Sequence, residues 1–283
     1  TLYYIDKSRF DELLDKKINI KIKAELFSKF CRLNTLYMIA KAGSGHIGSS
    51  FSSLDIFSWL YLSELKFNKN LHLEDGDIFF SSKGHDAPGF YAVLCGLGHL
   101  DFKYIDKLRK LDGLPGHPDI KTNGIATNTG SLGMGISKAK GMIFSRRLRN
   151  IKGRIFVLTG DGELQEGQFW ESLQSAANHK MDELFVIVDH NKLQSDTFVS
   201  HVSDLGDLES KIKSFNWNVL QCDGNDFNSL KDAMSNLNKL SGPKLLIANT
   251  IKGKGVSFIE GHGKWHHKIP NDIEFKAILE ELK

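Results

Sequence analysis

Apolar residues recur at helical spacing through the first half of the chain. Between residues 21 and 42 they return every three or four positions, which predicts an amphipathic helix. Weaker patterns of the same kind predict helices over 53–65, 87–97 and 133–149. A loop rich in glycine, proline and asparagine is expected over 111–130, before the last of these helices.

The second half alternates short apolar runs with helical stretches. Residues 155–158 and 184–188 are continuously apolar and predict two buried strands, and shorter runs predict strands over 77–80, 219–222 and 245–248. Helices are expected between and after these strands, over 168–177, 208–215, 230–240 and from 272 onward. Strands without polar alternation that are joined by helices indicate a parallel sheet covered on both faces.

We therefore expect a single α/β domain over residues 1–283, because no linker, repeat or low-complexity segment interrupts the pattern. Residues 1–18 are charged and weakly patterned, and we expect them to form an arm on the surface. The composition agrees with a globular protein, since 41% of the residues are hydrophobic and 25% are charged.

Charge and cysteine content exclude several classes of function. The net charge of +3 is small and dispersed, so nucleic-acid binding is not expected. The three cysteines are odd in number and lack the spacing of a metal site, which favours a reducing compartment and a cytoplasmic protein. No apolar stretch approaches the roughly 20 residues of a membrane span, and the first residues do not resemble a signal peptide.

Two polar residues follow the two clearest strands. Asp161 comes directly after the strand at 155–158, within Gly160-Asp161-Gly162, and Asn191 follows the strand at 184–188. Alone, this motif reads most simply as a strand-to-helix turn. If the two strands are adjacent, however, both side chains project into the crevice where parallel sheets bind ligands. A carboxylate with an amide oxygen suits Mg²⁺, and Gly162 before a helix allows a diphosphate to approach the backbone.

A second glycine-rich segment and several histidines are candidates for the same site. Gly130-Ser131-Leu132-Gly133-Met134-Gly135 precedes a predicted helix, but its spacing is not that of a dinucleotide-binding loop, and no Walker-type motif occurs in the chain. Histidines also lie beside glycines or glycine-rich loops, where functional residues concentrate: His46, His85, His117, His266 and His267. Imidazoles can donate hydrogen bonds to phosphate and sugar hydroxyls and move protons near neutral pH.

Together these motifs resemble the transketolase family of thiamine diphosphate enzymes. Asp161 in Gly160-Asp161-Gly162, followed by Asn191, is similar to the cofactor fingerprint of that superfamily, and the extension through Gly167 resembles transketolases in particular. Further matches occur in the order of the family over 27–270: Gly45-His46, Lys83-Gly84-His85, Gly116-His117-Pro118, Gly130-Ser131-Leu132-Gly133 and Lys252-Gly253-Lys254-Gly255.

The resemblance implies a role for each matching residue. Those expected to hold a divalent cation, Mg²⁺ or alternatively Ca²⁺ or Mn²⁺, are Asp161, Asn191 and the carbonyl of Leu193. Those expected to contact thiamine diphosphate are His85, Gly130, Ser131, Leu132, Asp161, Gly162, Asn191 and His266. His46 and His117 would face the sugar donor, and Glu166 would lie near the interface between active sites. The last histidine of the family matches either His266 or His267, and we prefer His266 because it follows Trp265.

The resemblance also implies a partner. In the family, a second domain holds the aminopyrimidine ring of the cofactor and supplies a glutamate that activates it, whereas this sequence stops after the first domain. We therefore expect the amino-terminal subunit of a split transketolase. It would pair with a carboxy-terminal subunit in a heterotetramer with two copies of each, and act on sugar phosphates.

Three alternatives remain open at this stage. A synthase of the 1-deoxyxylulose-5-phosphate type shares the diphosphate-binding layout but begins from pyruvate. A non-catalytic subunit could hold cofactor and metal for assembly alone. A nicotinamide oxidoreductase is possible on an α/β sheet, but the chain lacks its fingerprint.

Overall fold

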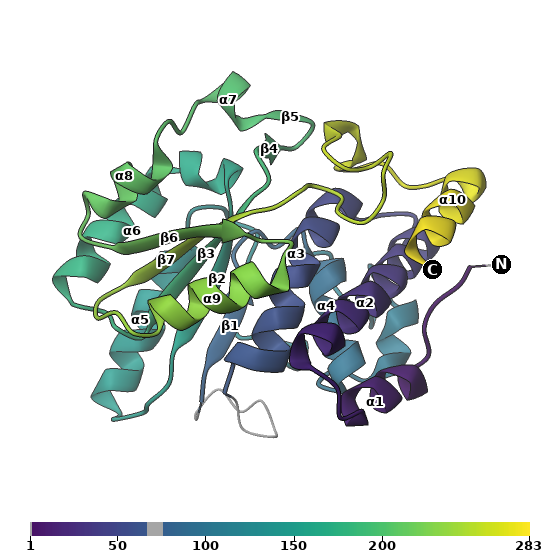
Figure 1. Ribbon diagram of the computed structural model, residues 1–283, viewed down its shortest axis with the longest axis horizontal. Helices are drawn as coiled ribbons and strands as arrows, with labels where there is room; N and C mark the ends of the chain where they lie inside the picture. The colour runs from purple at the N-terminus through teal and green to yellow at the C-terminus, as the bar shows by residue number, and fades with distance from the viewer. Residues whose placement is uncertain (1, 67–75) are drawn as a thin grey trace.

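A parallel β-sheet forms the centre of the computed structural model, which describes residues 2–66 and 76–283 (Figure 1). Its strand order is β1-β2-β3-β7-β6, and all neighbouring pairs are parallel. The strands of this sheet are β1 (Ile78–Ser81), β2 (Ile155–Gly160), β3 (Leu184–His190), β6 (Asn218–Asp223) and β7 (Lys244–Asn249). All five predicted strands are therefore confirmed, and β2 and β3 are adjacent, with Val157 opposite Val186.

Helices cover both faces of the sheet, because its strands present apolar side chains on each side. Phe156 and Leu158 of β2 belong to one core and Ile155 and Val157 to the other. The helices around the first core are α2 (Ile20–Ala42), α3 (Ile47–Trp59), α4 (Ala87–Leu97) and α9 (Phe227–Leu237). Those around the second are α5 (Gly135–Leu148), α6 (Gly167–Asn178) and α8 (Leu208–Lys213). The α/β fold class is thus confirmed.

The amino-terminal segment differs from the prediction. It forms helix α1 (Lys7–Asp15), and the side chains of Phe10 and Leu13 are buried rather than spread on the surface. The Phe10 ring meets the Phe27 ring edge-on at 5.4 Å between centroids. A Cβ at Gly96 would come within 2.6 Å of the Phe10 ring, so α4 needs a glycine there. The expected arm over 1–18 therefore packs on the surface through a short helix that the sequence pattern did not predict, anchored by these two apolar side chains.

The remaining differences concern short elements and one helix start. Helix α3 begins at Ile47, six residues before the predicted start at 53, because its first turns are rich in buried serines that hide the apolar period. Sequence periodicity also gave no sign of the small hairpin β4 (Leu193–Gln194) and β5 (Thr197–Phe198) or of helix α7 (Val199–Val202). The last helix, α10 (Asp272–Leu282), starts where predicted.

Short helical turns of other types join these elements. A π-helical turn, η1 (Leu60–Glu64), extends α3, and the remaining turns are 3₁₀-helical: η2 (Phe102–Asp106), η3 (Gly162–Gln165) and η4 (Gly263–Trp265). The turn η3 follows β2 directly and η4 precedes His266. The turn η3 therefore carries Gly162 of the predicted site, and η4 ends next to His266.

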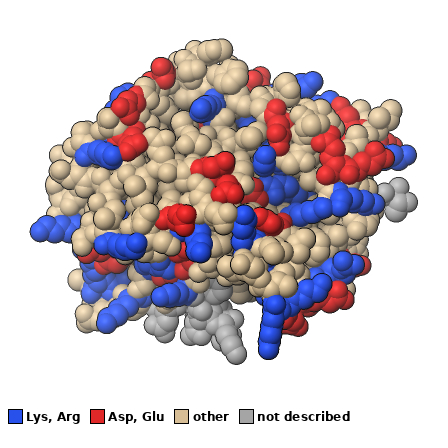
Figure 2. All heavy atoms as spheres, in the orientation of Figure 1, with Lys and Arg blue, Asp and Glu red and all other residues tan. Residues whose placement is uncertain are grey.

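The surface carries charges of both signs. Figure 2 shows lysine and arginine side chains interspersed with aspartate and glutamate over the face that it presents. Within residues 2–66 and 76–283, none of the helices combines the length and apolar character needed to cross a membrane. The cysteines Cys31, Cys95 and Cys222 are all buried and free.

Candidate active site

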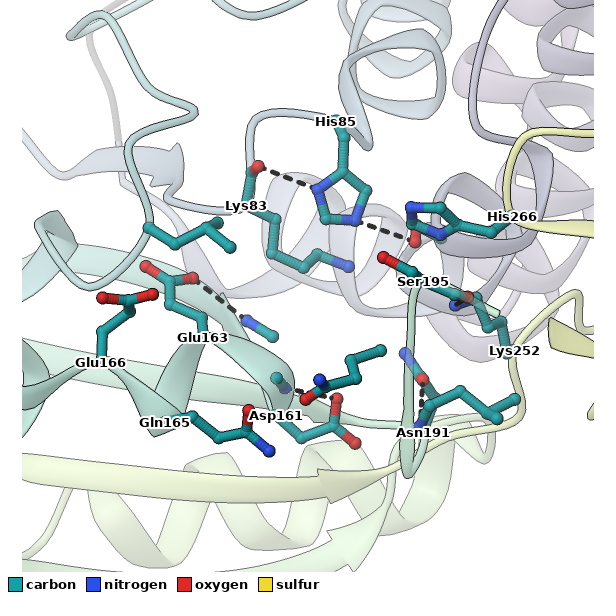
Figure 3. A pocket seen from close by; sticks show the side chains of 16 residues that line it. Lys83, His85, Asp161, Glu163, Gln165, Glu166, Asn191, Ser195, Lys252 and His266 are labelled. Carbon is teal, nitrogen blue, oxygen red and sulfur yellow. Dashed lines mark hydrogen bonds between the residues drawn. The ribbon is translucent and has the colours of Figure 1, made fainter. Parts of the chain in front are cut away.

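A cavity of about 290 Å³ opens at the carboxyl ends of the sheet strands (Figure 3). Four of its lining residues follow four adjacent strands: Lys83 follows β1, Asp161 follows β2, Asn191 follows β3, and Lys252 follows β7. Parallel strands deliver polar side chains to one edge of the sheet in this way, because their backbones end there and their side chains leave the core. The sequence-based expectation that Asp161 and Asn191 would meet at this edge agrees with their positions.

A tight turn after β3 brings the expected cation ligands together. Lys192 adopts a left-handed conformation with φ of 67°, and its N–H donates to a carboxylate oxygen of Asp161. Asp161 also accepts a hydrogen bond from the N–H of Gly162 at 2.9 Å. One residue further along, the N–H of Leu193 donates to Oδ1 of Asn191 at 3.1 Å. The turn that contains Asn191 and Leu193 is therefore hydrogen-bonded to the carboxylate of Asp161.

The environment of Asp161 disfavours an ionised carboxylate that has no positive charge beside it. Its side chain is 2% exposed. Burial, and then the nearby carboxylate of Asp189, raise its pKa to about 7, despite the hydrogen bonds from Lys192 and Gly162. A divalent cation beside the carboxylate would oppose both causes, since positive charge favours the ionised form. Oxygen ligands of this kind with room for water suit Mg²⁺, and they suit Ca²⁺ only if further oxygens join.

The wall next to Asp161 is closely packed at Gly162 and Gln194, both of which line the cavity. A Cβ at Gly162 would lie 2.7 Å from Cβ of Gln194, so only glycine fits at the start of η3. The side-chain oxygen of Gln194 is buried and has no hydrogen-bond partner among the described residues. Such an unsatisfied polar atom in a ligand cavity is a ready contact for a bound molecule. The residues present therefore fit a cation with an anionic ligand.

Glu163 fixes the glycine-rich segment to this wall. The carboxylate is 2% exposed and accepts hydrogen bonds from the N–H of Gly133 at 2.9 Å and the N–H of Gly160 at 3.3 Å. The hydroxyl of Ser82 donates to it as well. Burial raises the pKa of Glu163 to about 7, and these donors counteract part of the rise. Glu163 thus ties the end of β2 to the segment that includes Leu132, which lines the cavity.

Two histidines, His85 and His266, line the other wall, and His46 from a third segment packs against their rings. His85 is fixed by both ring nitrogens, Nδ1 at 3.0 Å from the carbonyl of Lys83 and Nε2 at 3.0 Å from Oγ of Ser49. The ring of His266 lies 5.2 Å from that of His85 and 5.0 Å from that of His46. Burial lowers the pKa of His46 to about 4 and that of His266 to about 3, so both imidazoles are neutral at pH 7.

The predicted site residues do not all line the cavity. Those that do are His85, Leu132, Asp161, Gly162, Glu166, Asn191, Leu193 and His266. His117 instead packs over the glycine turns beside it, since a Cβ at Gly84 or at Gly130 would lie 2.7 Å from its ring. His46 contacts the rings of the lining histidines, and Ser131 is exposed nearby. His267 is exposed whereas His266 is buried.

Sequence reasoning missed a buried ion cluster below the cavity. Nζ of Lys83, 3% exposed, lies 2.5 Å from Oδ2 of Asp189 and 3.4 Å from Oδ2 of Asp86. Burial would lower the pKa of Lys83, but the two carboxylates outweigh it and raise the pKa. Oδ2 of Asp189 also accepts a hydrogen bond from Nδ2 of Asn191 at 3.2 Å. Asp189 therefore orients the amide whose oxygen is an expected cation ligand.

Lys252 was also missed as a member of the site. Its side chain is almost fully buried, and Nζ donates to the carbonyl of Ser195 at 2.7 Å. Burial lowers the pKa of Lys252 to about 8. The available signal was its place in Lys252-Gly253-Lys254-Gly255, shortly after the end of β7.

Comparison with known proteins places this arrangement among thiamine diphosphate enzymes. The family model "Transketolase, thiamine diphosphate binding domain" matches residues 23–278. An apulose-4-phosphate transketolase subunit from Actinobacillus succinogenes is 40% identical over 84% of this chain and 88% of its own. The 6-deoxy-6-sulfo-D-fructose transketolase subunit SqwG of a Clostridium species is 34% identical over 95% of this chain and 98% of its own.

A solved structure shares the fold. The transketolase of Campylobacter jejuni superposes with a TM-score of 0.84 and 29% identity over 94% of this chain. The match covers 43% of the Campylobacter jejuni chain. This chain therefore spans less than half the length of that enzyme, but most of the length of the two related subunits.

Proposed function

This chain belongs to the transketolase family, and on that basis we propose that it is the diphosphate-binding subunit of a two-chain transketolase. The cofactor of the family domain is thiamine diphosphate, used with a divalent cation. The proposed reaction transfers a two-carbon ketol unit from a ketose to an aldehyde acceptor. The strongest support is the hydrogen bond from the turn of Asn191 and Leu193 to Asp161, with all three residues lining one cavity.

The cation and the diphosphate would share the wall formed after β2 and β3. Asp161, Asn191 and the carbonyl of Leu193 would hold the cation, and Gly162 would let the diphosphate approach the backbone. When bound, thiamine diphosphate supplies the electron sink for cleaving the bond next to the ketose carbonyl. Further contacts to the cofactor would come from His85, Gly130, Ser131, Leu132 and His266.

The remaining predicted residues would contact the sugar or lie near the subunit interface. We assign His46 and His117 to the hydroxyls of the donor, and the neutral state of His46 allows it both to donate and to accept a hydrogen bond. Glu166 is exposed at the cavity and would place its carboxylate near the interface between active sites. The names of the two related subunits refer to a phosphorylated ketose and a sulfonated ketose. We therefore propose a donor with an anionic group at its far end.

The aminopyrimidine half of the cofactor would be held by a carboxy-terminal partner subunit. Support comes from the relatives that match along 88% and 98% of their own length, because both are named as transketolase subunits. A cavity of about 290 Å³ is also at the lower limit of small-molecule sites, as expected for one end of a larger ligand. We propose a heterotetramer with two copies of each subunit.

The cysteines support a cytoplasmic location. Cys31, Cys95 and Cys222 are buried and unpaired, and burial raises the pKa of the Cys95 thiol to about 12. Unpaired cysteines of this kind are usual in a reducing compartment. We therefore propose that the two-chain enzyme works in the cytoplasm.

Reconstitution tests the proposed function. The chain alone, given a ketose phosphate, an aldose acceptor, thiamine diphosphate and Mg²⁺, is expected to show no ketol transfer. Addition of a carboxy-terminal partner subunit should restore turnover by at least about 100-fold, since misplacement of a reacting group by about 1 Å already costs that much. The measurement is coupled detection of the shortened aldose product.

Three results of the same assay would contradict the proposal. Ketol transfer by the chain alone would show that no partner is needed. Release of carbon dioxide from pyruvate by the pair, without ketol transfer, would favour a synthase of the 1-deoxyxylulose-5-phosphate type. Cofactor binding by the pair with neither activity would favour a non-catalytic subunit.

A further inference from the structure

Three imidazoles meet beside the cofactor cavity. His46, His266 and His267 each present one ring nitrogen such that these nitrogens lie within 4.8 Å of one another. The ring centroids are separated by 5.0 Å for His46 and His266, 4.6 Å for His46 and His267, and 4.4 Å for the consecutive pair. His46 immediately precedes α3 and the other two follow η4, so segments far apart in the sequence converge here.

These rings are not committed to other partners in the way that His85 is. Both nitrogens of His85 have hydrogen-bonding contacts at 3.0 Å, and in Figure 3 its ring points toward the cavity next to His266. By contrast, Nδ1 of His266 is buried and has no hydrogen-bond partner among the described residues. The His266 residue as a whole is only 7% exposed. A buried, unsatisfied ring nitrogen in a cluster of imidazoles calls for a ligand.

Two cationic side chains near His46, Lys252 and Arg109, donate hydrogen bonds to other atoms. Nζ of Lys252 donates to the carbonyl of Ser195 at 2.7 Å, and Nη1 of Arg109 donates to Oγ of Ser44 at 2.8 Å. An ion could enter between the imidazoles while Lys252 and Arg109 keep these hydrogen bonds. The three nitrogens can therefore converge without breaking a hydrogen bond made by these two cations.

The spacing is within reach of tetrahedral coordination. Bonds of 2.0–2.1 Å from zinc to histidine place ligand nitrogens about 3.3 Å apart. The three nitrogens, within 4.8 Å of one another, would have to close by about 1.5 Å at most to reach that separation. The exposed side chain of His267 can move to shorten its distances to the other two rings. Any shortening between His46 and His266 would be a small shift of two buried side chains. A fourth position would remain for water.

We propose that His46, His266 and His267 form a binding site for a transition-metal dication of the zinc class in the cofactor-free chain. Imidazole nitrogens favour zinc, copper, nickel and cobalt, whereas the oxygens of Asp161 and Asn191 favour magnesium. The two sites therefore select different ions. An ion held by the histidines would occupy the imidazoles of His46 and His266, and under the function proposed above it would block the enzyme.

Titration with Co²⁺ tests the site, because tetrahedral Co²⁺ absorbs strongly in the visible range and Zn²⁺ displaces it. The cofactor-free chain is titrated in excess Mg²⁺, which occupies the oxygen ligands. We expect one equivalent of Co²⁺ to bind with a tetrahedral spectrum. Replacement of an outer-shell partner typically costs 10–100-fold in metal affinity, so loss of a direct ligand in His267→Gln should weaken binding by at least about 100-fold.

The control is His262→Gln, which removes another exposed histidine of the same loop and should bind Co²⁺ like the unmodified chain. Thermal unfolding of both variants without metal confirms that each is folded. Equal Co²⁺ affinity in His267→Gln and the unmodified chain would overturn the proposal, and so would an octahedral spectrum or the absence of stoichiometric binding. These readouts do not depend on enzymatic activity, so the site can fail while the proposed function stands.

Discussion

Replacement of Asp161 by asparagine is expected to abolish the Mg²⁺-dependent binding of thiamine diphosphate. The carboxylate of Asp161 is the only formally charged group among the expected cation ligands, and it is 2% exposed. Asparagine keeps the shape of the side chain but removes the charge that attracts the cation. Because even outer-shell changes cost 10–100-fold in metal affinity, we expect a loss of at least about 100-fold by isothermal titration calorimetry.

The matched control is Asp196→Asn, which removes an exposed carboxylate close to the same turn. This variant should keep its affinity for the cofactor. Without cations, Asp161→Asn should be at least as stable as the unmodified chain at pH 8, because burial raises the pKa of Asp161 to about 7 and its ionised form is therefore poorly accommodated. Unchanged cofactor affinity in Asp161→Asn would overturn the proposed cation site.

The Lys83→Met variant is expected to cause the largest loss of stability. It leaves the carboxylates of Asp86 and Asp189, both fully buried, without their cationic partner. Removal of one member of a buried ion pair typically costs about 3–5 kcal/mol. The free energy of unfolding, measured in urea, should fall by that amount at pH 7.5. Lys103→Met, which breaks an exposed pair with Asp101, should leave it nearly unchanged.

A second variant separates charge from packing. Asp189→Asn in the Lys83→Met background removes one of the stranded carboxylates and should recover part of the lost stability, as a double-mutant cycle would show. Additive losses in the two variants would contradict the view that Lys83 acts through Asp189. In that case Lys83 would stabilise the fold through packing and not through its ion pair with Asp189.

The fold could be predicted from sequence where burial determines residue type. Strands β2 and β3 are buried on both faces, so nearly every position is apolar and the signal is continuous. The start of α3 could not be found in this way, because its buried polar residues form hydrogen bonds with distant groups. Ser52 donates to Asp189 at 2.7 Å, across 137 positions of sequence. Helix α1 was missed for a related reason, since its anchor Phe10 has its partners in α2 and α4.

In the site, too, some residues were found from local sequence patterns, whereas others depend on contacts with distant residues. Asp161 and Asn191 were found because each directly follows a strand, and that relation is local in sequence. The roles of Glu163 and Asp189 depend on hydrogen bonds to Gly133 and Lys83, which no local pattern reveals. The role proposed for His267 could not be inferred from local sequence either, because its ring contacts that of His46, which lies far away in the sequence. Local signals therefore pointed to the proposed cation ligands, whereas the residues that support them required the folded chain.

Locating the cation is the decisive test of the proposed cofactor site. Crystals of the chain would be grown with Mn²⁺ and thiamine diphosphate, and an anomalous difference map would be calculated at the manganese absorption edge. We expect one strong peak bound by the carboxylate of Asp161, the amide oxygen of Asn191 and the carbonyl of Leu193, with cofactor phosphate against Gly162. A fully occupied manganese ion elsewhere, with no peak between Asp161 and Asn191, would contradict the site.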